Sequence, residues 1–335
     1  MLNYKTIYLR GLLFVAGLAT YGAAQAADNS QFWQKSPSVL YFGEKIPVQD
    51  ENNFRRRLKL IADSGVNAVV AGGGVGDAAA RDFFDDFASD PSLKRFKVIY
   101  RLNQALSDYH AKKCQGQSTD CAAPPWLFEL VQFLSRQDRV VGYYVFDEPA
   151  TYHAERGGRI APDFQLKVYK VIRQADPDRV SRPVINTNHA YQRGQDENVV
   201  LRHLSPSFQD MVFLQRYSTD VQKFKKDNEL WRKSKVLSSV PHVPIYPVFV
   251  KNKNHCSAVR DTLFFSKSRT WNLASFADSY RSSMIDYPDF KRVGVGFYSF
   301  RSKEGYSWWK HLDASACDDF AYAVAKFMDD SQQKR

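Results

Sequence analysis

The sequence predicts an α/β fold of one domain, a (β/α)8 barrel in which parallel strands alternate with helices. Short runs of β-branched, aromatic and aliphatic residues recur along the chain, and stretches with helical period separate them. This alternation is typical of α/β folds with parallel strands. The 335 residues are enough for eight such units, and no repeat, low-complexity segment or Pro/Gly-rich linker divides them.

Eight segments have the composition of buried strands, rich in Val, Ile, Phe and Tyr. They are residues 38–42, 66–71, 97–102, 140–146, 183–187, 210–214, 243–250 and 293–300. Apolar residues at helical spacing lie between them, at 54–61, 83–87, 126–134, 164–175, 221–233, 273–285 and 318–328. Gly294 and Gly296 alternate within the last expected strand, which suits a strand whose side chains crowd the axis of a barrel.

The first 26 residues have the order of a secretory signal peptide. Lys5 and Arg10 precede an apolar run at 11–20, and Ala24-Gln25-Ala26 supplies a small-x-small cleavage site. The apolar run is short for a bilayer span. We therefore expect cleavage after Ala26, an exported protein in the periplasm or secreted, no stable membrane insertion, and a barrel domain over residues 27–335.

The chain is basic, with a formal net charge of +11. A basic exported protein is suited to acidic polysaccharide or an anionic envelope surface, although the same charge also serves solubility. The densest basic stretch, residues 223–235, has the pattern of the solvated face of a helix. Export argues against nucleic acid as a partner, and no sequence feature specifies an oligomeric state.

Four cysteines follow the signal segment, and an even count in an oxidising compartment favours disulfides. Cys114 and Cys121 flank a polar loop, so we expect them to pair. Cys256 and Cys317 then pair by elimination. No Cys-x-x-Cys, His-x-His or His-Glu-x-x-His spacing occurs, and we expect no metal site.

Residues 74–79 match a loose dinucleotide-binding fingerprint, with Gly74, Gly76 and Ala79 at the required spacing. The match follows the second strand rather than the first, and the next strand does not end in an acid that could bind a ribose. A glycine-rich turn at the rim of a barrel explains it equally well. We expect no cofactor.

The segment GYYVFDEPA, residues 142–150, runs from apolar and aromatic residues directly into two acids. Active sites of such barrels lie at the carboxyl ends of the strands, so Asp147 and Glu148 are the expected catalytic residues, with Glu148 as general acid. Strand alternation predicts Tyr144, Phe146 and Glu148 on one face, with Asp147 on the other. The alternative is a helix N-cap, for which Asp-Glu-Pro is acceptable chemistry.

Other polar and aromatic residues follow the expected strands and could surround a sugar. Glu304 is the expected second carboxylate, and Asp220, Asp147 and Glu44 are the alternatives. The side chains expected to bind substrate are Tyr144, Asn188, Arg216, Tyr217, Tyr298, Arg301 and Trp308. The guanidinium forks of Arg216 and Arg301 suit an anionic sugar such as a uronic acid, unless they pair with Asp220 and Glu304.

The octapeptide GYYVFDEP resembles the fourth-strand segment of glycoside-hydrolase-like (β/α)8 proteins. Their large retaining clan ends this strand in Asn-Glu-Pro, and a subset of relatives reads Asp-Glu-Pro. The resemblance implies that Glu148 is the acid/base, that Asp147 replaces the sugar-contacting Asn, and that Tyr217 corresponds to the tyrosine that holds the nucleophile. The clan's nucleophilic Glu ends the seventh strand, where this chain reads VPIYPVFVKNKNH, without an acid.

These features predict a secreted glycoside hydrolase that acts on a poly- or oligosaccharide. The alternative is a non-catalytic glycan-binding protein on a degenerate barrel, and the missing seventh-strand acid motivates it.

Overall fold

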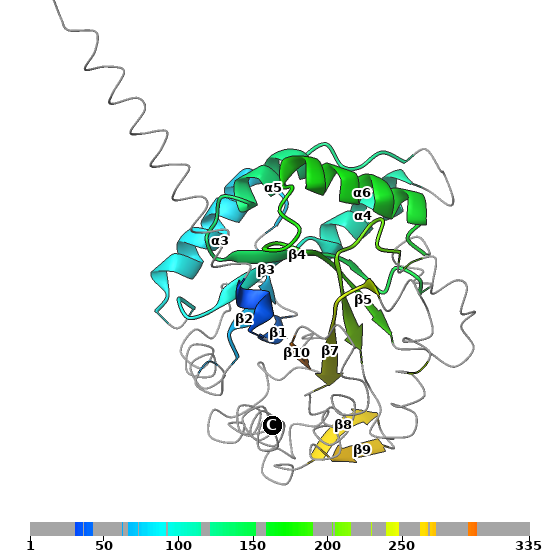
Figure 1. Ribbon diagram of the computed structural model, residues 1–335. Coiled ribbons are helices and arrows are strands. Elements are labelled where there is room, and N and C mark those ends of the chain that lie inside the picture. Colours follow the sequence, from blue (N-terminus) through cyan, green and yellow to red (C-terminus); the bar gives the residue numbers. More distant parts are fainter. Residues whose placement is uncertain are drawn as a thin grey trace, which may run out of the picture.

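The computed structural model describes residues 31–35, 37–42, 62, 66–72, 74–91, 93–114, 121–151, 159–189, 203, 205–215, 229, 239–247, 262–266, 269–272 and 294–299. Its main sheet consists of β1 (Ser38–Phe42), β2 (Ala68–Ala71), β3 (Lys97–Arg101), β4 (Val140–Asp147), β5 (Val184–His189), β6 (Met211–Gln215), β7 (His242–Pro247) and β10 (Val295–Ser299). Neighbouring strands are parallel, and the order β1-β10-β7-β6-β5-β4-β3-β2 closes through the pairing of β1 with β2 (Figure 1).

Four helices arch over the outer face of the sheet beside β2 to β5 (Figure 1). They are α3 (Asp77–Ser89), α4 (Asn103–Lys113), α5 (Leu127–Leu134) and α6 (Pro162–Ala175). The predicted α/β class with parallel strands is therefore confirmed, and each expected strand corresponds to an observed one. The other connections lie outside the described residues, so the eightfold βα repeat and the single-domain organisation stay predictions.

Strand alternation sorts the apolar side chains into two cores. The inner core is surrounded by the strands and consists of Trp33, Val39, Ala68, Val70, Ile99, Val141, Tyr144, Ile185, Met211, Phe213, Val243 and Ile245. A larger outer core packs the sheet against the helices. Trp33, in a helical turn at 31–34, closes the amino end of the inner core, where its indole N–H donates to the carbonyl of Val141 at 2.8 Å.

Two features of the fold were not predicted. Helix α4 buries Asn103, Leu106, Ser107 and His110, which have helical spacing but include a single apolar side chain. Strands β8 (Thr262–Ser266) and β9 (Arg269–Asn272) form a separate antiparallel pair. In both places the apolar pattern that sequence analysis depends on is weak or interrupted.

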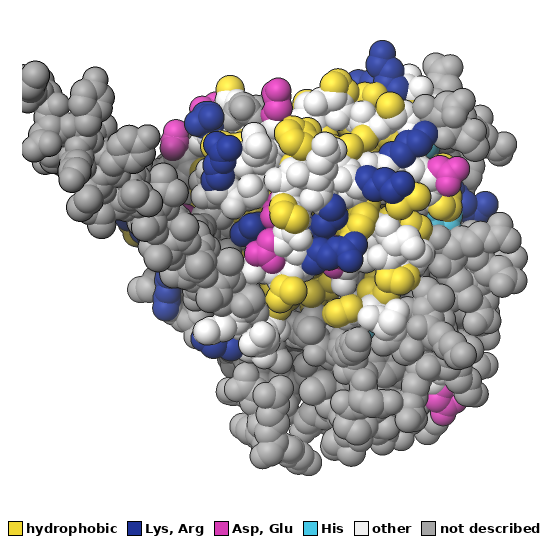
Figure 2. Space-filling model, turned by 45° about the horizontal axis from the view of Figure 1, so that its top comes forward, with side chains coloured by type: hydrophobic (Ala, Val, Ile, Leu, Met, Phe, Trp, Pro, Cys, Tyr) yellow, Lys and Arg dark blue, Asp and Glu magenta, His cyan; other side chains and the backbone are white. Residues whose placement is uncertain are grey.

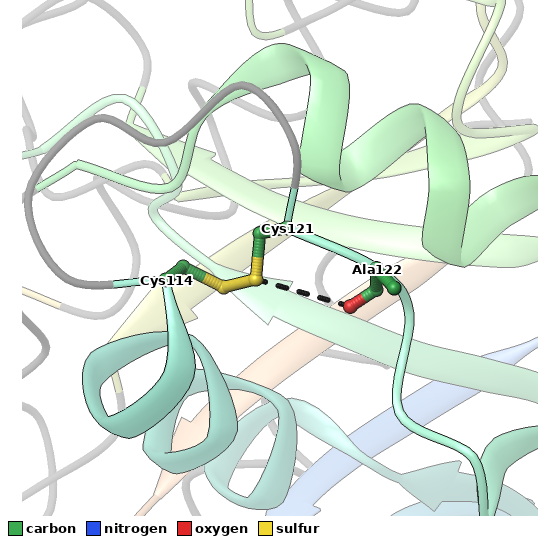
Figure 3. Close-up of a disulfide and its surroundings, with 3 residues drawn as sticks. All are labelled: Cys114, Cys121 and Ala122. Atoms are coloured by element: carbon green, nitrogen blue, oxygen red, sulfur yellow. Dashed lines mark hydrogen bonds between the residues drawn. A yellow bond between two sulfur atoms is a disulfide. The ribbon is translucent and has the colours of Figure 1, made fainter.

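The predicted disulfide between Cys114 and Cys121 is confirmed. Cys114 ends helix α4, and its Cα lies 5.2 Å from that of Cys121 (Figure 3). Both cysteines are buried in the outer core, at 2% and 8% exposure. The bridge therefore closes the loop after α4 and fixes the chain that leads into α5. Cys256 and Cys317 lie outside the described residues.

The turn between α6 and β5, at the amino end of the barrel, is held by a buried ion pair. Asp176 accepts hydrogen bonds from Arg182 Nε at 2.6 Å, Arg182 Nη2 at 3.1 Å and the hydroxyl of Tyr143 at 2.6 Å. Burial opposes ionisation of Asp176, but the bonds from Arg182 and Tyr143 and the Arg182 charge outweigh it and lower the pKa of the carboxyl. Burial, with the neighbouring Asp176 charge, raises the pKa of Tyr143 well above its usual value.

A second acid, the partly buried Asp210, supports the same turn from just before β6. It accepts from Arg173 Nη2 at 2.8 Å, from the Tyr169 hydroxyl at 2.8 Å and from the backbone N–H of Val184 at 2.9 Å. Burial and the hydrogen bond to Asp210 raise the pKa of Tyr169 to about 12. Asp176 and Asp210 thus hold the chain that leads into β5, through their bonds to Arg182 and to the N–H of Val184.

The surface over the helices carries Lys and Arg side chains scattered among hydrophobic and acidic ones (Figure 2). On this face the positive charge does not gather into one continuous patch. In the part of the chain that the structure describes, no helix combines the length and the apolar character needed to cross a bilayer.

Candidate functional site

The carboxyl end of β4 carries both expected catalytic acids. Asp147 is the last residue of the strand, and Glu148 follows it with a φ of 49°, the one positive value of a non-glycine residue in the described ranges. The N–H of Glu148 donates to the carbonyl of Thr187 at 3.1 Å, and its own carbonyl accepts from Thr151 at 2.9 Å. Glu148 also precedes Pro149, and a proline favours an extended backbone in the residue before it, so the expected extended conformation of Glu148 is wrong. The left-handed turn is held by the two backbone hydrogen bonds, one on each side of Glu148.

The pairing of β4 with β5 is irregular just before the acids. The register shifts between Tyr144 and Phe146, and the Phe146 N–H donates to the side-chain oxygen of Asn186 at 3.1 Å. Asn186 in turn donates to Gln209 at 2.9 Å. A buried amide side chain thus supplies an acceptor to the backbone at the irregularity.

This irregularity changes which side chains share a face. Tyr144 lies in the inner core with its ring 5.9 Å from that of Phe213, whereas Phe146 lies in the outer core, 6.0 Å from Phe164. The prediction that Tyr144 and Phe146 share one face is wrong, because strict alternation does not survive the register shift.

Tyr144 connects the inner core to the first acid. Its hydroxyl donates to Asp147 Oδ1 at 3.0 Å and accepts a hydrogen bond from Thr187 Oγ1. The Tyr144 side chain is only 1% exposed, so its ring packs within the protein and presents no face to a sugar. Its contact with the site is made through the hydroxyl.

Two further amides lie at the carboxyl ends of neighbouring strands. Gln215, the last residue of β6, shares its face with Met211 and Phe213 of the inner core, and its Oε1 has no hydrogen-bond partner within the described ranges. Asn188 is 1% exposed, and its Nδ2 is likewise unpartnered among the residues described. Alternation along β5 places Asn188 on the face of Val184, toward the helices, rather than on the inner face with Ile185.

Of the other expected site residues, Tyr298 lies in β10 opposite Tyr41 and Pro247, near the carboxyl end of that strand. The other expected site residues lie outside the described ranges: Glu304, Arg216, Tyr217, Arg301 and Trp308, with the alternatives Glu44 and Asp220. The expected signal segment, residues 1–26, lies outside them too. Among the residues that are described, no three His, Cys, Asp or Glu side chains form a group that could hold a metal ion.

Sequence reasoning missed Thr187 and Gln215 as site residues. Both end or nearly end a strand, and both share a face with inner-core residues two positions earlier, Ile185 and Phe213. That two-residue spacing was visible in the sequence, but it becomes informative only when the inner face of each strand is known.

No protein-family model matches the chain, and no curated protein matches it in sequence. Solved structures do resemble it. A proposed α-L-fucosidase from Bacteroides thetaiotaomicron is 9% identical with a TM-score of 0.54, over 89% of this chain and 94% of that one. A β-xylosidase of glycoside hydrolase family 39 from Caulobacter crescentus is 12% identical with a TM-score of 0.52, over 87% of this chain and 70% of that one.

At these identities the likeness concerns the fold. The predicted resemblance to glycoside-hydrolase-like barrels is confirmed at that level, because both neighbours are named as glycosidases and the match extends over most of the chain. The Asp-Glu-Pro motif and the roles of its residues are not tested by it.

Proposed function

We propose that the protein is an exported glycoside hydrolase built on a complete (β/α)8 barrel, with Glu148 as its general acid. The observation that carries this proposal is the backbone of Glu148. A left-handed conformation at a non-glycine residue costs about 1–3 kcal/mol and is retained where a side chain must be aimed at a site. Here it occurs at the carboxyl end of a barrel strand, where active sites of this fold lie.

In the proposed reaction Glu148 donates its proton to the glycosidic oxygen as the bond from that oxygen to the anomeric carbon breaks. A second carboxylate either activates water or attacks the anomeric carbon, and Glu304 is the first candidate for it. Carboxyl groups about 6.5–9.5 Å apart would give inversion, and a separation of about 5–5.5 Å would give retention. The substrate is a poly- or oligosaccharide, and the two arginines, Arg216 and Arg301, favour an anionic one.

A non-catalytic glycan-binding protein is the second candidate. It is favoured by residues 243–255, VPIYPVFVKNKNH, which contain no acid at the place where the resembling clan has its nucleophile. In that case Glu148 and Asp147 would accept hydrogen bonds from sugar hydroxyls without transferring a proton.

The test compares Glu148→Gln with the wild type on neutral and uronic-acid glycans, with reducing-end release as the readout. We expect the variant to lose at least about 100-fold in kcat, the usual contribution of a general acid. The matched control is Asp138→Asn, an exposed acid just before the same strand at the opposite end, which should leave kcat unchanged. Equal, measurable rates for Glu148→Gln and wild type would exclude Glu148 as the general acid. Glycan binding without any release by the wild type would favour the second candidate.

A further inference from the structure

Two adjacent tyrosines of β4 make the same kind of hydrogen bond in opposite directions. Tyr143 and Tyr144 are both buried, at 0% and 1% exposure, and each hydroxyl donates to an aspartate. Tyr143 reaches Asp176 at the amino end of the barrel, and Tyr144 reaches Asp147 at the carboxyl end. Asp176 also forms an ion pair with Arg182, so the Tyr143–Asp176 bond belongs to a structural cluster. The Tyr144–Asp147 bond ends at the proposed active site instead.

The two hydrogen bonds of the Tyr144 hydroxyl run in one direction, from Thr187 to Tyr144 and from Tyr144 to Asp147. The Thr187 hydroxyl donates to the Tyr144 oxygen, so the single phenolic proton is directed to Asp147 Oδ1. Thr187 and Tyr144 are 4% and 1% exposed, and at such burial water competes poorly for these bonds. One oxygen of the Asp147 carboxylate is thereby held in place by two successive hydrogen bonds that begin at Thr187 on the neighbouring strand β5.

Thr187 is also bound to the second acid. Its backbone carbonyl accepts the N–H of Glu148 at 3.1 Å, while its hydroxyl acts on Asp147 through Tyr144. A single residue of β5 therefore sets the positions of both acids at the end of β4.

We infer that Thr187 and Tyr144 are positioning residues, which fix the Asp147 carboxylate as a hydrogen-bond acceptor for the sugar hydroxyl beside the bond that Glu148 protonates. The inference rests on the proposed function, because it needs a sugar at this end of the barrel. It gives Tyr144 a role through its hydroxyl rather than through stacking. Neither residue touches the substrate in this arrangement.

The variants follow from the geometry. Tyr144→Phe removes the hydroxyl and keeps the ring against Phe213, and Thr187→Val removes the hydroxyl and keeps the branched shape. Each should lower kcat by about 10-fold to 100-fold, since a small misplacement of a reacting group has effects of this size. KM should change by less than about threefold, because positioning acts mainly on the transition state. Thr187→Ser, which restores a hydroxyl, should recover most of the rate.

Tyr143→Phe is the matched control. It removes the same hydroxyl from the adjacent, equally buried ring, but its partner Asp176 lies at the other end of the barrel. It should lower the free energy of unfolding and leave kcat unchanged at temperatures where the variant is folded.

The outcomes separate the two proposals. A loss of kcat in Glu148→Gln, Tyr144→Phe and Thr187→Val, with rescue by Thr187→Ser and none in Tyr143→Phe, supports the inference. If Glu148→Gln is inactive while Tyr144→Phe and Thr187→Val match Tyr143→Phe in kcat, the inference is overturned and the hydrolase stands. If Glu148→Gln is as active as wild type, or wild type cleaves no glycan, the proposed function fails and this inference fails with it.

Discussion

Replacing Asp176 by Asn should destabilise the protein strongly, because it takes away the closest counter-ion of the buried Arg182 charge. Asp176 is 2% exposed and Arg182 is 9% exposed, and the carboxylate receives two hydrogen bonds from the guanidinium group. An Asn amide offers one oxygen and places an NH2 group where a second acceptor is needed.

The size of the effect follows from the burial of the pair. Removal of one partner of a buried ion pair costs about 3–5 kcal/mol, a large share of a typical total stability of about 5–15 kcal/mol. The comparison variant is Asp178→Asn, whose carboxylate lies 3.8 Å from Arg182 Nη2 and is 25% exposed. This contact is longer and its acid is partly exposed, so it should contribute about 1 kcal/mol or less, and the variant should remain much closer to wild type than Asp176→Asn.

The pH dependence provides a second check. The pKa of Asp176 is lower in the folded protein than its usual value, so its stabilising contribution is fully present above the pKa of the unfolded chain, about 3.9, and is lost as the pH falls through the folded pKa. Urea unfolding should therefore give a constant gap between wild type and Asp176→Asn from pH 5 to pH 8, and a narrowing gap below about pH 4. A gap under about 1 kcal/mol at pH 7, or one that widens in acid, would refute the reasoning.

Three further variants test the fold. Cys114→Ser combined with Cys121→Ser should lower the unfolding free energy by about 2–3 kcal/mol, because the disulfide no longer restricts the unfolded chain over this short loop. An unchanged midpoint of urea unfolding would contradict this. Non-reducing peptide mapping would check the expected Cys256–Cys317 pair. Gly294→Ala should cost at least about 2 kcal/mol, because Gly294 has a φ of 135° and an added Cβ would meet the backbone oxygen of Pro37. Gly296→Ala would meet the flexible end of Ile245 and should cost less by the same measurement; equal losses would show that the backbone conformation at Gly294 is not the cause.

Most of the parallel sheet could be predicted from the sequence, because buried strands leave a strong local signal. The run at 140–146 is apolar or aromatic apart from Gly142, and it appears as β4 within one residue of its expected end. The position of Asp147 and Glu148 at the carboxyl end of that strand follows from the same run. Local composition is sufficient there, since every residue of the run before Asp147 is buried.

The direction of individual side chains could not be predicted, because it depends on contacts between strands. The register shift beside Tyr144 is stabilised by Asn186, which is 40 residues from its partner Phe146 along the chain. The hydrogen bond from Thr187 to Tyr144 spans 43 residues. Helix α4 was missed for another reason, since three of the four side chains on its buried face, Asn103, Ser107 and His110, are polar.

The position of Trp33 has a practical consequence for handling the protein. Its indole N–H donates to the carbonyl of Val141, near the start of β4, at the end of the barrel opposite Asp147 and Glu148. Residue 31, where this helical turn begins, therefore lies on the side of the barrel that faces away from both acids. Immobilisation through a tag placed after the expected signal segment and ahead of residue 31 should leave the proposed glycan site pointing into solution, so that surface-based binding measurements can use that end as the anchor.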